Sequence, residues 1–365
     1  MTTLDRRGGA LRGLWAMCAT MCLVSAGLAD EAPFYRGKRL TVLINFAASG
    51  PTDLEGRLFA KYLARHTAGE PGVVVQNMDG AGGLVGAQYL GEAAPRDGTL
   101  LGYLTGAAWR FSADPDKWRV DFRTYEFIAS QTSTTIHFVR TDVPPGIKEA
   151  TDIVKAKGLI AGGLSADASK DLRLRLGLDM LGVPYTYVTG YRSSPPARLA
   201  MQRGEIHMYS ESPPAYRAVV EPTMVRTGEA IPVFVDDVVD GPATSPQLDG
   251  LPILTLPSLY KKVKGTLPSG PLWEAYRTIY ETNATLTRII ALPPGAPKAA
   301  VEALRGAIEA MAHDRDFADE CLTSIGFVPD YVAAPSRRDE IRRMLVVPQQ
   351  VRAFIADYTR EVARR

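Results

Sequence analysis

Two stretches of the sequence place a loop of small residues between an apolar run and the start of a helix. In the first, the apolar residues 40–44 lead through Ala48, Ser49 and Gly50 to a helical pattern. In the second, residues 73–75 lead through a glycine loop to the helical pattern of residues 84–90. Backbone N–H groups at a helix start attract anions, each helix dipole contributing roughly 0.3–1 kcal/mol. The pattern therefore predicts an acidic ligand.

The first helix is predicted to begin close to Thr52. Thr52 and Glu55 have capping-box spacing, and Pro51 pre-sets a helical φ. Leu54, Leu58 and Tyr62 then recur at helical spacing. The free N–H groups of this helix would face the small-residue loop.

Charge and the amino-terminal segment limit the classes of function. Residues 1–29 combine three arginines with a short apolar run and a small-residue cleavage site, so we expect a signal peptide, periplasmic export and no lipid anchor. Without them, the 42 basic and 40 acidic residues of the chain each become 39, and no basic excess favours nucleic acid. Cys321 is the one cysteine left, so no internal disulfide is expected.

Strands alternating with helices along the chain predict a parallel α/β fold. About 336 residues exceed what one hydrophobic core usually serves, which favours two lobes. Extended chain is expected at residues 127–139, a helix at 147–157, and an irregular connection with short helical turns at 242–271. Residues 172–180 alternate as a strand would, yet also fit one helical face, and we expect a helix.

Five segments in order resemble the solute-binding proteins of tripartite tricarboxylate transporters, the TctC/Bug type of periplasmic receptor. They are VLINFAASGPTD, QNMDGAGGLVGAQYL, PRDGTLLGYLTG, GVPYTYVTGYRSSPPARLAMQRGEIH and IIALPPGAPKAAVEALRGAIEAM. The resemblance implies a two-lobed α/β periplasmic binding protein of type II architecture, with the ligand in an interlobe cleft. Lobe 1 would comprise residues 30–134 plus 236–365, and lobe 2 residues 135–235.

The same resemblance implies a monomeric receptor that captures a small carboxylate and delivers it to integral membrane permease subunits, with no catalysis and no cofactor. Residues matched to the family's cleft, together with candidates from the residue pattern, form the expected ligand-binding set. It comprises Ala48, Ser49, Gly50, Thr52, Asp53, Ala81, Gly82, Gly83, Thr105, Gly162, Ser165, Gly190, Tyr191, Arg192, Ser193 and His207.

Several positions depart from the family pattern. A proline and a glycine are common where Ala48 and Ser49 stand, an aspartate where His207 stands, and a lysine or proline where Arg192 stands. Arg192 can clamp a distal carboxylate or serve as a solvated loop charge. Asp53 can orient the first loop, bind a ligand amine, or only complement the helix dipole.

Other classes of function find weaker support. Gly80, Gly82 and Gly86 resemble a dinucleotide fingerprint with one residue too many, and no acidic residue follows the next strand. The four histidines lack metal-ligand spacing, and no GxSxG motif precedes a helix. A periplasmic sensor subunit stays open because it would share every pocket feature, and a secreted enzyme would need a nucleophile and base in the cleft.

Overall fold

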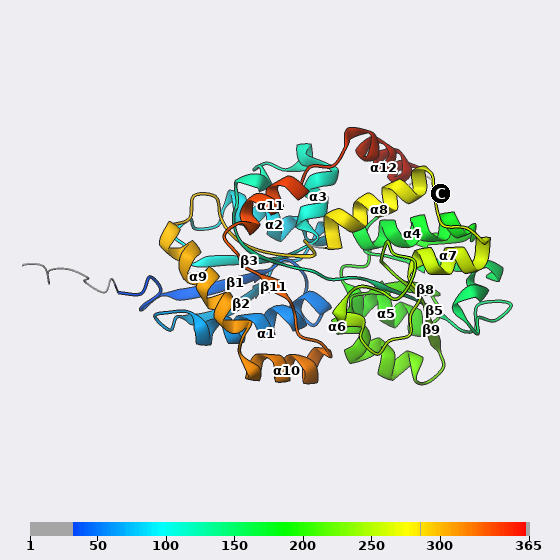
Figure 1. Ribbon diagram of the computed structural model, residues 1–365, viewed down its shortest axis with the longest axis horizontal. Helices are drawn as coiled ribbons and strands as arrows, with labels where there is room; N and C mark the ends of the chain where they lie inside the picture. Colours follow the sequence, from blue (N-terminus) through cyan, green and yellow to red (C-terminus); the bar gives the residue numbers. More distant parts are fainter. Residues whose placement is uncertain (1–31, 285, 363–365) are drawn as a thin grey trace, which may run out of the picture. The chain divides into compact units, whose positions relative to one another are not determined.

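The computed structural model describes residues 32–284 and 286–362. The chain divides after residue 33, and the fold below is that of the unit beginning at Phe34 (Figure 1). The signal peptide expected at residues 1–29 lies outside the described residues. Among the described residues, no helix combines the length and apolar character that a bilayer crossing needs.

The first sheet, sheet A, has the strand order β11-β4-β10-β3-β1-β2. Its strands are β1 (Arg39–Ile44), β2 (Gly72–Asn77), β3 (Leu100–Thr105), β4 (Glu126–Gln131), β10 (Arg288–Leu292) and β11 (Tyr331–Val332). β1 runs parallel to β2 and β3, as predicted, whereas β10 runs antiparallel to β3 and β4. The sheet is therefore mixed rather than parallel throughout, because β10 enters it from a distant part of the chain.

Both faces of sheet A are covered by helices (Figure 1). One face carries α1 (Pro51–His66), α9 (Lys298–Met311) and α10 (Arg315–Ile325), and the other carries α2 (Leu84–Glu92), α3 (Ala107–Ala113) and α11 (Arg337–Met344). Successive strand residues point to opposite faces, so Val42 and Ile44 join the first core while Leu43 joins the second. This two-sided burial explains the nearly continuous apolar run of β1.

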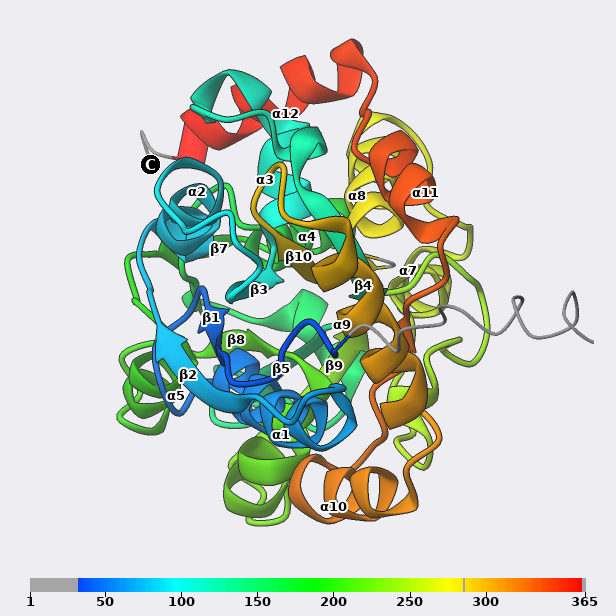
Figure 2. The ribbon, with the colours of Figure 1, turned by 90° about the vertical axis from the view of Figure 1, so that its left-hand side faces the viewer.

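The second sheet, sheet B, has the order β7-β6-β8-β5-β9. Its strands are β5 (Ile136–Arg140), β6 (Leu159–Gly162), β7 (Tyr185–Val188), β8 (Met208–Glu211) and β9 (Ala230–Val235). The core on one face contains residues of α4 (Ser169–Leu181), α7 (Leu256–Lys264) and α8 (Pro271–Ala284). The core on the other contains α5 (Ser194–Gln202) and the helical segment formed by α6 (Pro213–Ala215) and Tyr216–Val225 (Figure 2).

The chain passes from sheet A to sheet B between β4 and β5, and returns between β9 and β10. The return segment contains α7 and α8, both of which pack on α4. The carboxyl-terminal α12 (Gln349–Val362) then packs on α8 (Figure 1). Helix α7 lies within residues 242–271, where short helical turns in an irregular connection were expected; Thr255 caps it, and Leu256 and Leu259 are buried.

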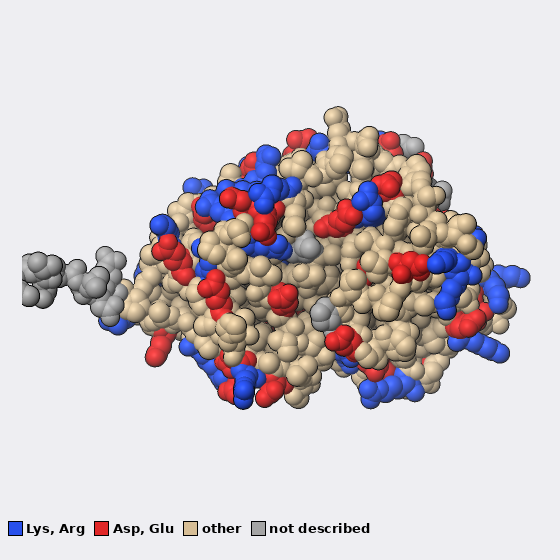
Figure 3. All heavy atoms as spheres, in the orientation of Figure 1, with Lys and Arg blue, Asp and Glu red and all other residues tan. Residues whose placement is uncertain are grey.

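Two further local expectations have clear outcomes. Residues 172–180 lie in helix α4, as predicted, and the four leucines that alternate along it are all buried because α4 is covered on several sides. The helix expected at residues 147–157 is only a 3₁₀ segment, Ala150–Lys155. Figure 3 shows basic and acidic side chains intermingled on the face in view, in keeping with the balanced charge of the sequence.

Candidate functional site

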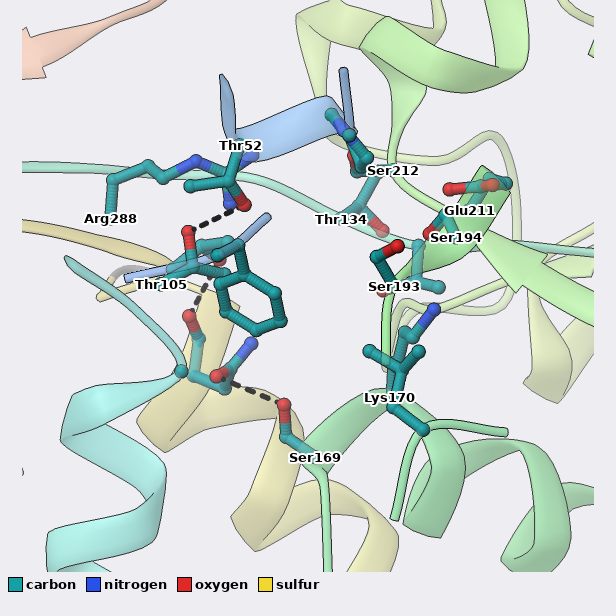
Figure 4. Close-up of a pocket in the computed structure, with 18 of the residues that line it drawn as sticks. Thr52, Thr105, Thr134, Ser169, Lys170, Ser193, Ser194, Glu211, Ser212 and Arg288 are labelled. Atoms are coloured by element: carbon teal, nitrogen blue, oxygen red, sulfur yellow. Dashed lines mark hydrogen bonds between the residues drawn. The ribbon is translucent and has the colours of Figure 1, made fainter. Parts of the chain in front are cut away.

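A pocket lies between the carboxyl ends of strands of sheet A and the helix starts beside sheet B. Its cavity of about 100 Å³ is well above the roughly 10–15 Å³ that a single water molecule needs. Its lining consists of Phe46, Ala47, Gly50, Pro51, Thr52, Thr105, Gly106, Thr134, Thr135, Leu164, Ser169, Lys170, Arg173, Ser193, Ser194, Glu211, Ser212, Asn283, Thr287 and Arg288. Figure 4 shows Thr52, Thr105 and Arg288 facing the Ser193–Ser194 side of this pocket.

Three helices begin at the pocket. They are α1 at Pro51, α4 at Ser169 and α5 at Ser194, and residues of each first turn line the cavity. None of the three has a side-chain hydrogen bond at its N-cap residue. Their partial positive ends therefore converge on one cavity, each favouring an anion by roughly 0.3–1 kcal/mol.

Arg173 places a partly unpaired guanidinium at the pocket. Its Nε donates to Asp236 Oδ2 at 2.7 Å, and its Nη2 donates to Thr135 Oγ1 at 3.1 Å. Its Nη1 is buried and has no hydrogen-bond partner among the described residues. A buried donor without a partner is costly, so a ligand acceptor at Nη1 would satisfy it.

Asp236 holds Arg173 in place through a buried network. Its Oδ1 accepts a hydrogen bond from the Tyr276 hydroxyl at 2.8 Å and lies 2.9 Å from His137 Nε2. Burial opposes ionisation of the carboxyl, but Arg173 and His137 outweigh it and hold the pKa of Asp236 at about 2. The carboxylate therefore stays charged and keeps the guanidinium oriented.

Ser210 extends this network into an arrangement that resembles a catalytic triad. Its Oγ lies 2.7 Å from His137 Nδ1, and the opposite ring nitrogen faces Asp236. A triad needs its serine beside bound substrate. Ser210, His137 and Asp236 are each at most 1% exposed, and none lines the pocket. The network positions Arg173 and offers no exposed nucleophile.

Arg288 and Glu55 form a second buried ion pair at the start of α1. Arg288 Nη2 lies 2.9 Å from Glu55 Oε2, and both side chains are almost fully buried. The predicted capping box of Thr52 and Glu55 was therefore wrong. The N-cap residue is Gly50, and Thr52 Oγ1 lies 3.0 Å from Thr105 Oγ1. The Glu55 carboxylate pairs with Arg288 of β10 and not with the backbone at the start of the helix.

Lys170 and Glu211 lie on the sheet B side of the pocket (Figure 4). Lys170 Nζ donates to the Tyr209 hydroxyl and to the Ser210 carbonyl oxygen, both at 2.9 Å. Burial alone would lower the pKa of Lys170, but Tyr209 and nearby carboxylates, Glu211 among them, outweigh it and raise the pKa. Glu211 Oε1 accepts a hydrogen bond from Arg198 at 2.5 Å.

The structure divides the sixteen sequence-predicted residues into three groups. Gly50, Thr52, Thr105 and Ser193 line the pocket. A separate hollow is lined by Ala81, Gly82, Ser165, Gly190, Tyr191 and Arg192. The remaining predicted residues, Ala48, Ser49, Asp53, Gly83, Gly162 and His207, line neither. Arg192 thus belongs to the separate hollow, and His207 Nδ1 accepts from the Ile160 amide at 3.2 Å.

Asp53 orients the first loop. It accepts hydrogen bonds from Ser49 N at 2.8 Å, Asn77 Nδ2 at 2.9 Å and Arg57 Nε at 2.9 Å. Burial opposes ionisation, but these donors lower the pKa of Asp53. Ser49 itself has φ of 64°, the left-handed region that favours glycine. A glycine would adopt this conformation without the strain that a serine side chain meets here.

Arg110 of α3 links the glycine loop to the segment that precedes α4. It donates to the Gly82 carbonyl oxygen at 3.0 Å, to Ser165 Oγ at 2.8 Å and to Asp167 Oδ2 at 2.9 Å. Gly82 has φ of 60°, and an added Cβ would overlap the Arg110 guanidinium. The second glycine loop is therefore held in shape by Arg110 beside the pocket.

The sequence interpretation missed all of the charged residues in the lining, namely Lys170, Arg173, Glu211 and Arg288. One signal was available in α4, where leucines recur on every side of a helix that also carries arginines. A buried charge needs a partner or a polar cavity. Glu211 and Arg288 lie at strand positions whose neighbours only the folded chain determines. No group of three or more His, Cys, Asp or Glu side chains suited to a metal ion occurs in the described part of the chain.

Comparison with known proteins agrees with this geometry. No family model matches the chain. A UPF0065 protein in the TAR-I ttuE-ttuC' intergenic region of Agrobacterium vitis is 32% identical over 189 residues, which cover 50% of this chain and 53% of that protein. A second UPF0065 protein, from Bordetella pertussis, is 29% identical over 180 residues, covering 46% of this chain and 54% of that protein. The matches thus span about half the length of these relatives.

Solved structures match over more of the chain. The periplasmic binding protein BugD has a TM-score of 0.63 and 19% identity, covering 88% of this chain and 98% of that one. MatC of Rhodopseudomonas palustris with bound malate has a TM-score of 0.60 and 20% identity, and the match covers 89% of this chain and 99% of that one. Rpa4515 of R. palustris with adipate also has a TM-score of 0.60 and 20% identity, and the match covers 90% of this chain and 96% of that one. The predicted resemblance to TctC/Bug receptors is thereby confirmed: the chain is a homologue of UPF0065 proteins over about half its length and has the fold of the periplasmic binding protein BugD.

Proposed function

We propose that this protein is a periplasmic solute-binding protein that captures a small carboxylate in the pocket between its two sheets. The observation that carries the proposal is the convergence of three helix N-termini with the unpaired Nη1 of Arg173 and the ammonium group of Lys170. The acidic group in the lining, Glu211, already pairs with Arg198. The pocket is therefore electrostatically suited to an anionic group.

The energetics suit a receptor. A hydrogen bond to a charged group contributes roughly 1.5–3 kcal/mol, and micromolar affinity needs about 8 kcal/mol. Arg173, Lys170 and two or three helix-start N–H groups reach that total after ordering costs are deducted. The malate bound by MatC and the adipate bound by Rpa4515 are small carboxylates and support this ligand class.

We also propose a lobe division that follows the packing. Lobe 1 would hold sheet A with residues 34–131 and 286–344, and lobe 2 would hold sheet B with residues 136–284. This assigns α7 and α8 to lobe 2, since both pack on α4. Closure of the lobes around the ligand would then act as a population shift toward the state in which both contact it.

The receptor would act as a monomer and pass its ligand to the permease subunits of a tripartite tricarboxylate-type transporter. Co-purification with such subunits tests this step, whereas co-purification with a kinase ectodomain would favour the sensor function. Ligand capture is tested first by thermal shift on refolded, ligand-free protein. We expect stabilisation by small carboxylates and none by their neutral amides, for example by succinate and not succinamide. Equal stabilisation by both members of such pairs would contradict the proposal.

A further inference from the structure

Helix α3 is shared between the hydrophobic cores of the two lobes. Phe111 belongs to a core of sheet A. Trp109 instead belongs to a core of sheet B, whose other buried members come from residues 139–279 and 347–355, and Ala113, one turn further along, packs against the same core. Helix α3 also packs on α8 (Figure 1). Lobe 1 therefore inserts a tryptophan into the interior of lobe 2.

The contact that Trp109 makes would be costly to break. Trp109 is 0% exposed. A tryptophan buries roughly 150–250 Å² of surface, and separating the lobes at α3 would return part of that apolar surface to water. Its Nε1 also donates a hydrogen bond to the backbone oxygen of Asp167, in lobe 2, at 3.1 Å. Both contributions favour joined lobes, and neither involves a ligand.

Arg110 forms a second connection between the lobes. Its Nη1 lies 2.9 Å from Asp167 Oδ2, and its Nη2 donates to Ser165 Oγ at 2.8 Å. The Arg110 side chain is only 8% exposed, although that of Asp167 is 48% exposed and partly screened by water. Since Nε donates to the Gly82 carbonyl oxygen, each guanidinium nitrogen already has an acceptor in the protein. Arg110 thus differs from Arg173, because its hydrogen bonds are complete before a ligand arrives.

We propose that Trp109 and Arg110 are positioning residues that hold the lobes of the ligand-free protein together at α3. The inference rests on the receptor function and the lobe division proposed above, and it adds a state that they leave open, in which the lobes are joined before capture. A receptor whose binding-competent state is already populated loses less of its affinity to closure. Three hydrogen bonds still permit brief opening, through which a solute can enter the pocket.

The test measures the distance between two nitroxide labels on ligand-free protein by pulsed electron paramagnetic resonance. Labels at Gln76→Cys, in β2 of sheet A, and at Thr186→Cys, in β7 of sheet B, occupy exposed positions of the two lobes. Cys321, the one cysteine beyond residue 29, is fully buried and should not react. In otherwise unaltered protein we expect one short distance with a narrow distribution.

A bridge variant, Trp109→Phe combined with Asp167→Ala, removes two of these three hydrogen bonds. We expect it to show a second, longer distance, with the ratio of joined to separated lobes reduced about tenfold or more, the scale of one charge-assisted hydrogen bond. The matched control is Trp118→Phe combined with Asp142→Ala. It changes the same residue types within single lobes, because Trp118 lies in a core of sheet A and Asp142 pairs with Arg140. The control should keep the single short distance.

Two results would overturn the proposal. One is a second, longer distance in the otherwise unaltered ligand-free protein. The other is a bridge variant with the same distance distribution as its control. If the bridge variant does not fold, Asp167→Ala alone replaces it, with the same expected second distance. None of these measurements uses a ligand, so the carboxylate receptor is tested separately, by the thermal shift described above.

Discussion

Replacing Asp236 by asparagine should leave the buried Arg173 guanidinium without its negatively charged partner. The carboxylate accepts from Arg173 Nε at 2.7 Å and from Tyr276 at 2.8 Å, and it is 1% exposed. Removing one partner of a buried ion pair costs about 3–5 kcal/mol, because the remaining charge stays uncompensated. We therefore expect Asp236→Asn to lower the free energy of unfolding at pH 7 by that amount, measured by urea denaturation.

Asp236 also makes the free energy of unfolding depend on pH in the acid range. The pKa of Asp236 falls from 3.8 to about 2 on folding, and each unit corresponds to about 1.36 kcal/mol, so this carboxylate contributes about 2 kcal/mol. Because the folded pKa is the lower one, this contribution is present above about pH 4 and is lost as the pH falls through 2. Asp236→Asn should lack this pH dependence in a pH series of urea denaturation.

Two further variants make the reasoning refutable. Asp240→Asn alters an exposed aspartate of the same segment, paired with Lys261, and should leave stability nearly unchanged. Arg173→Met combined with Asp236→Asn should recover much of the loss, because no stranded charge remains. The account of the network would be refuted if Asp236→Asn lowered the free energy of unfolding by less than 1 kcal/mol. It would also be refuted if the double variant lost as much free energy of unfolding as the two single variants together.

Two other perturbations follow from the site. Arg288→Met leaves the fully buried Glu55 carboxylate without its cation, so we expect a loss of about 3–5 kcal/mol in urea denaturation, and a loss below 1 kcal/mol would contradict the pairing. Gly82→Ala forces a Cβ into a φ of 60° and against the Arg110 guanidinium. It should lower the thermal midpoint and weaken ligand binding, whereas Gly228→Ala, at a φ of 79° with open space around the added Cβ and outside the pocket lining, should show only the backbone cost.

Local patterns predicted the elements that carry the anion-binding helix starts. The apolar run of β1, the small-residue loop and the periodicity of α1 are all local, and all three were confirmed. The β-branched run of β2 and the glycine loop before α2 were equally readable. Thr52 and Thr105 entered the predicted set through the resemblance to TctC/Bug receptors, which matches them to the first loop and to the end of the third strand.

The charged part of the pocket depends on long-range partners and was not predictable in this way. Arg288 meets Glu55 across 233 residues, and Arg173 meets Asp236 across 63. Glu55 has the spacing of a capping box, but its carboxylate pairs with the buried Arg288, which the local sequence does not reveal. Arg192 has the chemistry of a ligand clamp, yet its loop lines the separate hollow beside the pocket.

The most direct test of carboxylate capture is calorimetric titration of ligand-free protein and of Arg173→Lys with the tightest carboxylate found. Lysine keeps a positive charge beside Asp236 but lacks the guanidinium fork and its unpaired Nη1. The account predicts one site of about micromolar affinity, at least tenfold weaker in Arg173→Lys and unchanged in the control Arg192→Lys. Unchanged affinity in Arg173→Lys, or a complete loss in Arg192→Lys, would contradict it.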